Sequence, residues 1–290
     1  MAVNALGIDV SVWDDNNSTP QMVDFNKAKS AGASFVFMKS SQGVALDQDF
    51  VMNWQNAGNA GILRGVYHYL DMVHKPANKT ANQWAIDQAV FLWGVVKNLK
   101  LNFPAVCDYE DAGGLPAGTV RLAFKTFLDS FFTLSGVRCI VYTGSGFWSI
   151  NGSADQYWLQ YPVWWAQYYY QNVPAGPKLA PPFTSWLFWQ YSDKGDGPTY
   201  GCESKQVDLN YYNGTVAQLY QYANVPLPIP GTPDKPARLD ELSRMQAYVN
   251  GRRAELGPVD PADPVKSARF NELDRMQLYI TVRTAEVNAS

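Results

Sequence analysis

The sequence has little of the chemistry that binds metals or carries redox reactions. Its 290 residues contain two histidines and three cysteines, and Cys107, Cys139 and Cys202 lack the spacing of metal ligands. We therefore expect no metal, no cofactor and three reduced thiols in a chain made in the cytoplasm. The formal net charge of −3 comes without a long basic run, which argues against nucleic acid as a partner.

Three further absences narrow the class of protein. The N-terminal segment MAVNALGIDVSVW has neither the basic nor the long apolar part of a secretory signal. No apolar stretch is long enough to span a bilayer, so we expect no membrane insertion. Neither GxGxxG after an expected strand nor GxxxxGK[ST] occurs, which removes the usual sequence evidence for nucleotide binding. The 47% of hydrophobic residues predict a globular chain with a sizeable core.

Composition changes at the proline-rich stretch 225–236. All ten tryptophans and only two glutamates precede it, whereas the chain after it is rich in Arg and Glu and poor in large aromatics. Prolines favour an extended, semi-rigid connection. We therefore predict a large domain over residues 1–224, a linker over 225–236 and a separate region over 237–290.

The C-terminal region contains an internal repeat. Residues 237–255 recur as residues 268–286, with 11 of 19 positions identical. The apolar positions follow helical spacing in both copies, so each copy predicts one amphipathic helix. Two such helices bury little core by themselves. We expect them to pack on the large domain, on a second copy of the chain or on the cell wall, and we favour a homo-oligomer slightly over wall targeting.

The large domain alternates between expected strands and helices. Five apolar runs read as strands, and amphipathic helix patterns lie between them, most clearly over 80–99 and 120–132. Three more strand-like segments follow, 161–170, 185–193 and 206–214, joined by connections too rich in Pro and Gly for helices. Strands that are apolar on both faces predict a parallel sheet covered by helices. The sequence therefore predicts an α/β fold, an irregular (β/α)5(β)3 barrel resembling a TIM barrel, with a small C-terminal helical repeat region.

Four carboxylates are expected at one end of this barrel. Side chains alternate along a strand, so Asp108 and Glu110 of PAVCDYEDAGG point the same way. Asp9 ends the first strand and Asp208 lies in the last, and these two strands are neighbours in a closed barrel. The expected rim also carries seven aromatic residues: Tyr67, Tyr69, Tyr142, Trp164, Trp165, Trp189 and Tyr191.

Such a cluster has three possible uses. It could bind a hard cation, it could be structural, or it could cleave glycosidic bonds with a protonated acid beside an ionised carboxylate. Aromatic rings fit the apolar faces of sugars, so the aromatic rim favours the glycosidase. We expect the neighbouring like charges to raise the pKa of Glu110, as a general acid requires.

Seven segments in order resemble the signatures of glycoside hydrolase family 25, the Chalaropsis-type lysozymes or N-acetylmuramidases. They are GIDVSVWD, FVFMKSSQG, GVYHYL, PAVCDYED, VYTGSGFW, VWWAQY and FWQYSDKG…VDLNYYNG, and they cover roughly residues 4–220. The resemblance implies a catalytic barrel, agrees with the strand count reached above, and implies Glu110 as general acid with Asp108, Asp9 and Asp208 as the other catalytic acids. It also implies sugar contacts for Lys39, Tyr67, Tyr142 and Gln190, to which the aromatic rim adds Trp165 and Trp189.

These features predict hydrolysis of bacterial peptidoglycan between N-acetylmuramic acid and N-acetylglucosamine. The resemblance and the expected lack of a signal imply an endolysin made in the host cytoplasm and acting on the cell wall after release. Two alternatives remain open. One is a glycosidase for another N-acetylated polysaccharide such as chitin, and the other is a non-catalytic carbohydrate-binding barrel.

Overall fold

The computed structural model describes residues 4–16, 18–19, 22–227, 235–258 and 264–289. It divides into two compact units, Met1–Leu227 and Pro228–Ser290. Each unit has its own packed interior and is described separately below.

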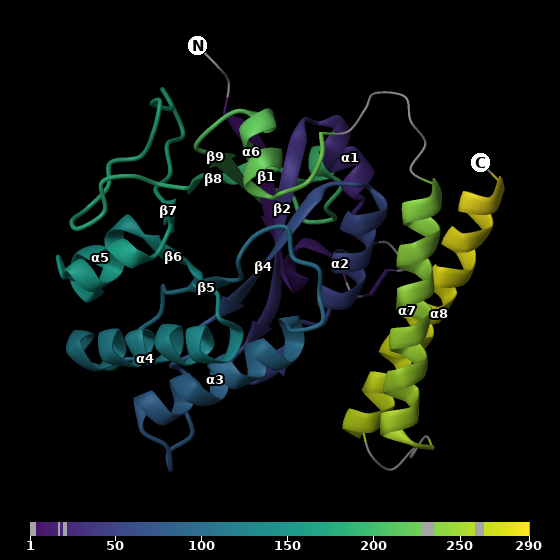
Figure 1. The fold of residues 1–290 in the computed structure, drawn as a ribbon, viewed down its shortest axis with the longest axis horizontal. Helices are drawn as coiled ribbons and strands as arrows, with labels where there is room; N and C mark the ends of the chain where they lie inside the picture. Colours follow the sequence, from purple (N-terminus) through teal and green to yellow (C-terminus); the bar gives the residue numbers. More distant parts are fainter. Residues whose placement is uncertain (1–3, 17, 20–21, 228–234, 259–263, 290) are drawn as a thin grey trace. The chain divides into compact units, whose positions relative to one another are not determined.

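Nine strands form the sheet of the first unit (Figure 1). The strands are β1 Ala5–Val10, β2 Ala33–Gln42, β3 Ala45–Leu46, β4 Leu63–Tyr69, β5 Val106–Asp108, β6 Ile140–Gly144, β7 Val163–Ala166, β8 Phe188–Asp196 and β9 Gln206–Tyr212. They follow the order β1-β9-β8-β7-β6-β5-β4-β2-β3, and β1 also pairs with β2. That pairing closes an eight-stranded barrel, while β3 is a two-residue addition to β2.

Helices follow the first five strands of the barrel. They are α1 Phe25–Ser30, α2 Phe50–Asn59, α3 Ala81–Val96, α4 Ala117–Ser135 and α5 Ser145–Asn151, with α6 Val216–Tyr222 after β9 and three 3-10 turns, η1 Val12–Asp14, η2 Gln156–Gln160 and η3 Gly197–Tyr200. No α-helix separates β7 from β8 or β8 from β9, since η2 precedes β7 and only η3 precedes β9. The predicted arrangement of five strand–helix units and three further strands is therefore confirmed.

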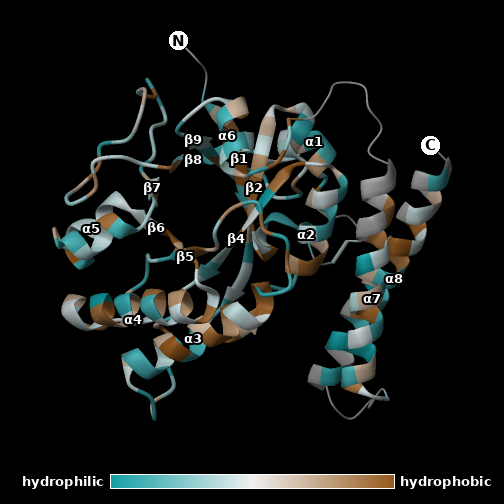
Figure 2. Ribbon diagram, in the orientation of Figure 1, coloured by the Kyte–Doolittle hydropathy of each residue, from teal (hydrophilic) through white to brown (hydrophobic). Residues whose placement is uncertain are grey.

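Helix boundaries follow local sequence chemistry. Thr80 and Gln83 form a reciprocal capping box at the start of α3, in which each side chain accepts a hydrogen bond from the other's backbone N–H. Gly136 ends α4 in the left-handed conformation that favours glycine. Apolar and polar residues alternate along both helices in Figure 2, and α3 and α4 lie side by side with their apolar faces buried.

Aromatic side chains fill the barrel interior. Phe37 stacks on Trp164 with ring centroids 4.6 Å apart, and Phe35 and Phe188 pack beside them. Small residues on the neighbouring strands make room, because a Cβ atom at Gly7 would overlap the ring of Phe35. Gly7 on β1 therefore makes room for the ring of Phe35 on β2.

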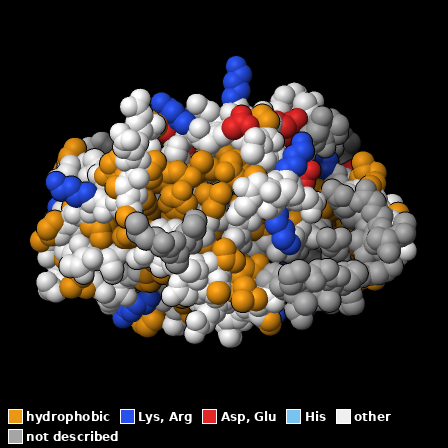
Figure 3. Space-filling view, turned by 90° about the horizontal axis from the view of Figure 1, so that it is seen from above, with side chains coloured by type: hydrophobic (Ala, Val, Ile, Leu, Met, Phe, Trp, Pro, Cys, Tyr) orange, Lys and Arg blue, Asp and Glu red, His pale blue; other side chains and the backbone are white. Residues whose placement is uncertain are grey.

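Helix α6 closes the amino end of the barrel. Its Leu219 and Tyr220 are buried with Ala5 and Tyr212 in the interior cluster. Figure 3 views the structure from above Figure 1, where α6 lies, and hydrophobic side chains gather near the middle of that face. Val216 and Tyr222 are among the exposed apolar residues that α6 carries. The carboxyl end of the parallel strands lies opposite α6.

The second unit is a helical hairpin of α7 Lys235–Leu256 and α8 Pro264–Ala289. Helix α7 begins within the stretch that we expected to be linker, while residues 228–234 and 259–263 lie outside the described residues. Six apolar side chains at the repeated positions are buried: Leu242, Met245, Val249, Leu273, Met276 and Ile280. Gln246 and Gln277 occupy equivalent positions in the two copies of the repeat, and their side-chain amides exchange two hydrogen bonds of 2.8 Å. Equivalent residues of the two copies therefore contact each other.

Candidate active site

The structure brings the four predicted acids to the carboxyl end of the barrel. Asp9 pairs directly with Asp208 in the register of β1 and β9, and Asp108 is the last residue of β5 with Glu110 two residues beyond. Strand β9 runs antiparallel to both neighbours. Asp208 therefore lies near the start of its strand, and it reaches the same edge as the other acids because that strand is reversed.

Gln190 on β8 connects two of these carboxyl groups. Its amide nitrogen donates to Oδ2 of Asp9 and to Oδ2 of Asp208, each at 2.9 Å. Its amide oxygen accepts from the hydroxyls of Tyr142 at 2.7 Å and Tyr168 at 2.8 Å. All four hydrogen bonds of the amide are thus made, which fixes both its position and its orientation.

A second amide completes the environment of Asp9. Asn210 donates to Oδ2 of Asp9 at 2.7 Å and accepts at 2.8 Å from the indole N–H of Trp164. Asn210 is fully buried. The Asp9 carboxylate is therefore held from two strands, β8 and β9, by donors that are themselves oriented.

The four acids differ in their access to solvent. Asp108 and Asp9 are buried, with 5% and 8% of their surface exposed, and Asp208 is half-buried. Glu110 is exposed. Only Glu110 of the four therefore presents its side chain openly to a large molecule approaching the barrel end.

Burial and mutual repulsion raise the pKa values of the buried acids. Burial raises the pKa of Asp9 to about 6, although hydrogen bonds from Asn210 and Gln190 oppose the rise. The pKa of Asp208 rises to about 9 through burial and then the charge of Asp9. Burial, followed by the charge of Glu110, holds the pKa of Asp108 well above its usual range.

The pKa of Glu110 is also raised, but its main cause differs from the expectation. Loss of water around the carboxyl group contributes most, and the charge of Asp111 adds to it. Lys39 and a hydrogen bond from Tyr142 oppose the rise. The expectation from the sequence names only the neighbouring like charges. Because Glu110 is exposed, solvent limits the size of the effect.

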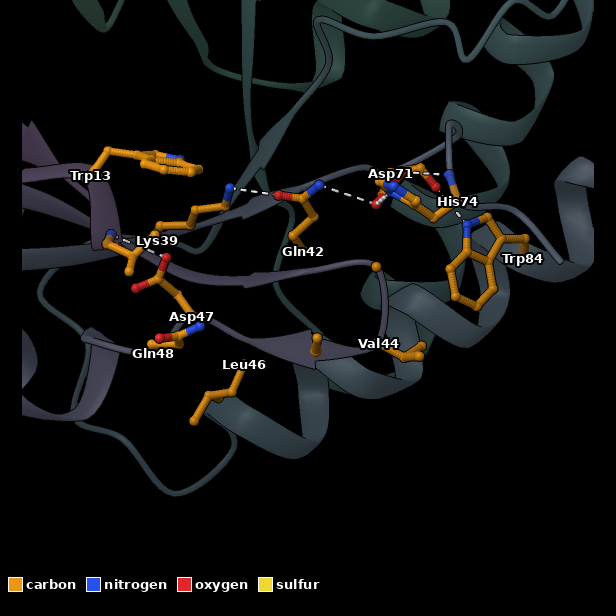
Figure 4. A pocket seen from close by; sticks show the side chains of 13 residues that line it. Trp13, Lys39, Gln42, Val44, Leu46, Asp47, Gln48, Asp71, His74 and Trp84 are labelled. Carbon is orange, nitrogen blue, oxygen red and sulfur yellow. Dashed lines mark hydrogen bonds and ion pairs between the residues drawn. The ribbon is translucent and has the colours of Figure 1, made fainter. Parts of the chain in front are cut away.

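A chain of hydrogen bonds holds Lys39, the cation that acts on these acids. Its Nζ donates to Oε1 of Gln42 at 2.7 Å, and Nε2 of Gln42 donates to Oδ2 of Asp71 at 3.1 Å (Figure 4). Although burial opposes it, hydrogen bonds from His74 and Gln42 lower the pKa of Asp71. The ionised Asp71 therefore turns the amide N–H of Gln42 toward itself and the amide oxygen toward Lys39.

Two of the predicted aromatic contacts are placed near the acids. Tyr142 is buried, and its hydroxyl bonds to Gln190. Tyr67 packs against the interior cluster and Trp164, and the charges of Asp9 and Asp108 add to the burial that raises its pKa. Both side chains point into the barrel at the level of the carboxylates.

Trp165 and Trp189 are corrections to the expected sugar-binding set. Both are fully buried on the outer side of their strands. Trp165 packs against Trp148 and Phe183, and the indole N–H of Trp189 donates to the backbone oxygen of Gln167. Side-chain alternation explains the placement, because their neighbours Trp164 and Gln190 point inward.

Sequence reasoning missed Asn210 and Tyr168 as members of the site. Asn210 follows Asp208 by two residues, so strand alternation alone could have placed it on the same face. Tyr168 follows β7 in an irregular segment, where no periodic pattern predicts its direction. Among the described residues no group of three or more His, Cys, Asp or Glu side chains is arranged to bind a metal ion.

His68 and the cysteines fill structural positions. His68 is fully buried between Ser41 and Gln88, and burial lowers its pKa to about 3. All three cysteines are free and buried, and burial raises the pKa of Cys107 well above the ordinary range, which removes its thiolate. Within the part of the chain that the structure describes, no helix combines the length and the apolar character needed to cross a membrane.

Sequence comparison finds relatives over most of the chain. The family model of the glycosyl hydrolases family 25 matches residues 8–199. Lysozyme M1 of Streptomyces globisporus is 31% identical over 226 residues, which cover 75% of this chain and 71% of that protein. The uncharacterized protein YegX of Escherichia coli K12 is 33% identical over 224 residues, covering 75% of this chain and 73% of that protein.

A solved structure has a similar fold. The bacterial lysozyme from Streptomyces coelicolor superposes with a TM-score of 0.62 at 28% identity, over 77% of this chain and 98% of that chain. The chain belongs to glycosyl hydrolase family 25, the lysozymes and muramidases that hydrolyse peptidoglycan.

Proposed function

We propose that the chain is an N-acetylmuramidase that cuts the β-1,4 bond between N-acetylmuramic acid and N-acetylglucosamine, with Glu110 as general acid. One observation carries the assignment: of four acids gathered at the barrel end, three are buried or half-buried and only Glu110 is exposed. The raised pKa of Glu110 keeps its proton available above the ordinary range of glutamate. Glu110 then protonates the glycosidic oxygen as the bond breaks.

Asp108 suits the role of orienting the substrate's own N-acetyl group. Its Oδ1 is buried and has no hydrogen-bond partner among the described residues. An amide N–H of the substrate can supply the missing partner. In this proposal the acetamido oxygen attacks the anomeric carbon, Asp108 accepts the amide proton's hydrogen bond, and water later opens the ring with retention.

Asp9 places an oriented negative charge beside the reacting sugar, while Asp208, whose pKa rises to about 9, stays protonated near neutral pH. The transition state of glycoside cleavage carries positive charge on the sugar ring. The Asp9 carboxylate, already held by Gln190 and Asn210, stabilises that charge without reorganising. Lys39 limits the total negative charge and so opposes protonation of the acids.

Product analysis tests the bond assignment. Purified Gram-positive peptidoglycan is digested, and the released fragments are reduced and identified by mass spectrometry. We expect disaccharide–peptide fragments with muramic acid at the reducing end. Fragments with reducing-end glucosamine, or free stem peptides, would show that a different bond is cut.

We also propose that this activity lyses bacteria from within, as the sequence resemblance to endolysins implies. Expression in a bacterial cytoplasm tests the idea. We expect lysis only when a separate membrane-permeabilising protein is induced together with the chain. Lysis by the chain alone, or no lysis with both proteins, would contradict an endolysin role.

For the C-terminal hairpin we propose self-association. Its seam residues are buried, yet Leu278 and Val282 lie one turn apart on α8 with 67% and 47% of their surfaces exposed. A second copy would cover this apolar strip. Sedimentation velocity on the full chain and on a chain ending at Leu227 tests this. An oligomer only with the hairpin is expected, whereas monomers in both would favour wall targeting.

A further inference from the structure

A cavity of about 420 Å³ opens beside the carboxylates, at the carboxyl ends of β1, β2 and β4. Lys39 lines it and also acts on Asp108 and Glu110, so the cavity and the acids share one residue. Figure 4 shows Trp13, Gln42 and Asp71 arranged along the same side as Lys39. The cavity therefore lies next to the proposed cleavage site. Its lining residues differ in chemistry from the four acids of that site.

Part of the lining is strongly apolar and exposed. Trp13 has 80% of its surface exposed and Val44 46%, and Leu46 and Trp84 contribute further apolar surface. Exposed apolar groups beside a catalytic site gain free energy when a ligand covers them. The ligand should therefore carry small apolar groups.

The acids that line the cavity are already occupied. Asp47 accepts hydrogen bonds from the backbone N–H groups of Val12 and Asp49, one on each oxygen. Asp71 accepts from His74 on both oxygens and from Gln42. Each oxygen of both carboxylates therefore already accepts at least one hydrogen bond from the protein.

Donors remain available. Among the described residues Gln42 is the one hydrogen-bond acceptor of the Lys39 ammonium, which carries three protons. The His74 side chain is 74% exposed, and its Nδ1 is engaged with Asp71. The cavity therefore offers the Lys39 cation next to apolar walls. That combination suits a carboxylate flanked by methyl groups.

We propose that this cavity binds the first residues of the peptide that peptidoglycan carries on the lactyl group of N-acetylmuramic acid. The inference rests on the proposed function. In this proposal the lactyl ether leaves the same sugar whose bond Glu110 cleaves, and the peptide runs toward Lys39, which acts on Glu110. Its lactyl and alanyl methyl groups fit Trp13 and Val44, and the glutamyl carboxylate fits Lys39.

Two forms of one substrate test the proposal. Glycan strands with stem peptides are compared with the same strands after an amidase has removed the peptides, and kcat/KM is measured on each. The full chain is used as wild type, Val44→Asp and Val73→Asp. Val73 is a matched control, because it is 55% exposed on the loop after β4 but does not line the cavity.

We expect the wild type to prefer the peptide-bearing strands. Val44→Asp should lower the ratio of kcat/KM on peptide-bearing strands to kcat/KM on peptide-free strands by about tenfold, because it places a negative charge beside the bound carboxylate. Val73→Asp should leave that ratio within about twofold. Equal rates of the wild type on both substrates, or an equal loss on both in Val44→Asp, would overturn the peptide site and leave a sugar site or a purely structural role.

The same digests separate this inference from the proposed function. Muramic acid at the reducing end keeps the muramidase assignment whatever the ratio shows. Glucosamine at the reducing end overturns the muramidase assignment. The ratio of kcat/KM on the two substrates still decides whether the cavity binds the peptide.

Discussion

Replacing Asp208 by asparagine should stabilise the barrel at neutral and alkaline pH. Burial and the charge of Asp9 raise the pKa of Asp208 from 3.8 to about 9. The folded protein therefore keeps a proton on this group that the unfolded chain has lost. The contribution of Asp208 to the free energy of unfolding is therefore complete below pH 4, and it is lost progressively as the pH rises toward 9.

The size of the effect follows from the shift. Each pH unit between the unfolded and folded pKa values costs about 1.4 kcal/mol of unfolding free energy for one proton. Asp208 is half-buried, so water reduces this cost. We expect Asp208→Asn to gain roughly 1–3 kcal/mol at pH 8 relative to the wild type, and nearly nothing at pH 4. Asparagine keeps an oxygen for the Gln190 amide, so that hydrogen bond persists.

Urea unfolding at pH 4, 6 and 8 provides the assay. All ten tryptophans lie between Trp13 and Trp189, so their fluorescence reports the barrel and not the hairpin. Asp87→Asn, at a partly exposed ion pair on α3, is the control and should leave the pH dependence unchanged. An unchanged pH slope in Asp208→Asn, or a loss of stability at pH 8, would refute the reasoning.

Three other substitutions test separate parts of the site. Gln190→Ala removes the amide between Asp9 and Asp208, and kcat should fall about 10–100-fold through misplaced carboxylates; a kcat near wild type would contradict its positioning role. Lys39→Met removes the positive charge that lowers the pKa of Glu110. The apparent pKa on the alkaline side of the profile of kcat/KM against pH should therefore rise by about 0.5–1 unit, and a fall in that pKa would contradict the reasoning. Trp165→Phe should keep kcat/KM within about twofold while unfolding free energy falls by about 1–3 kcal/mol, and lost activity with unchanged stability would restore Trp165 to the substrate site.

The barrel was predictable from the sequence because the hydrophobic pattern differs between the first and the last part of the domain. Apolar strands with amphipathic helices over the first part, and bare strands afterwards, correspond to the helices that follow β1, β2, β4, β5 and β6. The direction of β9 was not predicted. Yet the connection between Asp196 and Gln206 is too short for a parallel crossover, so its length already indicated an antiparallel pair.

The site was predictable where one side chain of a strand is known to face inward, because its neighbours then alternate between the two faces of the sheet. It was less predictable elsewhere. Asp108 and Glu110 share a face because one residue separates them. Trp164 and Trp165 are adjacent, and both are large and aromatic, so composition could not say which one faces inward. The pairing of Trp164 with Tyr142 in the register of β6 and β7 decides it. The cavity beside Lys39 depends on three loops that are distant in sequence, which no local pattern brings together.

The most direct measurement compares wild type with Glu110→Gln on purified peptidoglycan, by the rate at which reducing-end muramic acid appears. Glutamine keeps the shape of the side chain and removes the proton donor. Glu203→Gln is the matched control, since Glu203 is the other glutamate of the first 231 residues and accepts hydrogen bonds from Asn16 and Thr19. We predict a loss of about 1,000-fold or more in Glu110→Gln and near-normal rates in Glu203→Gln. A Glu110→Gln protein as active as wild type would show that Glu110 is not the acid.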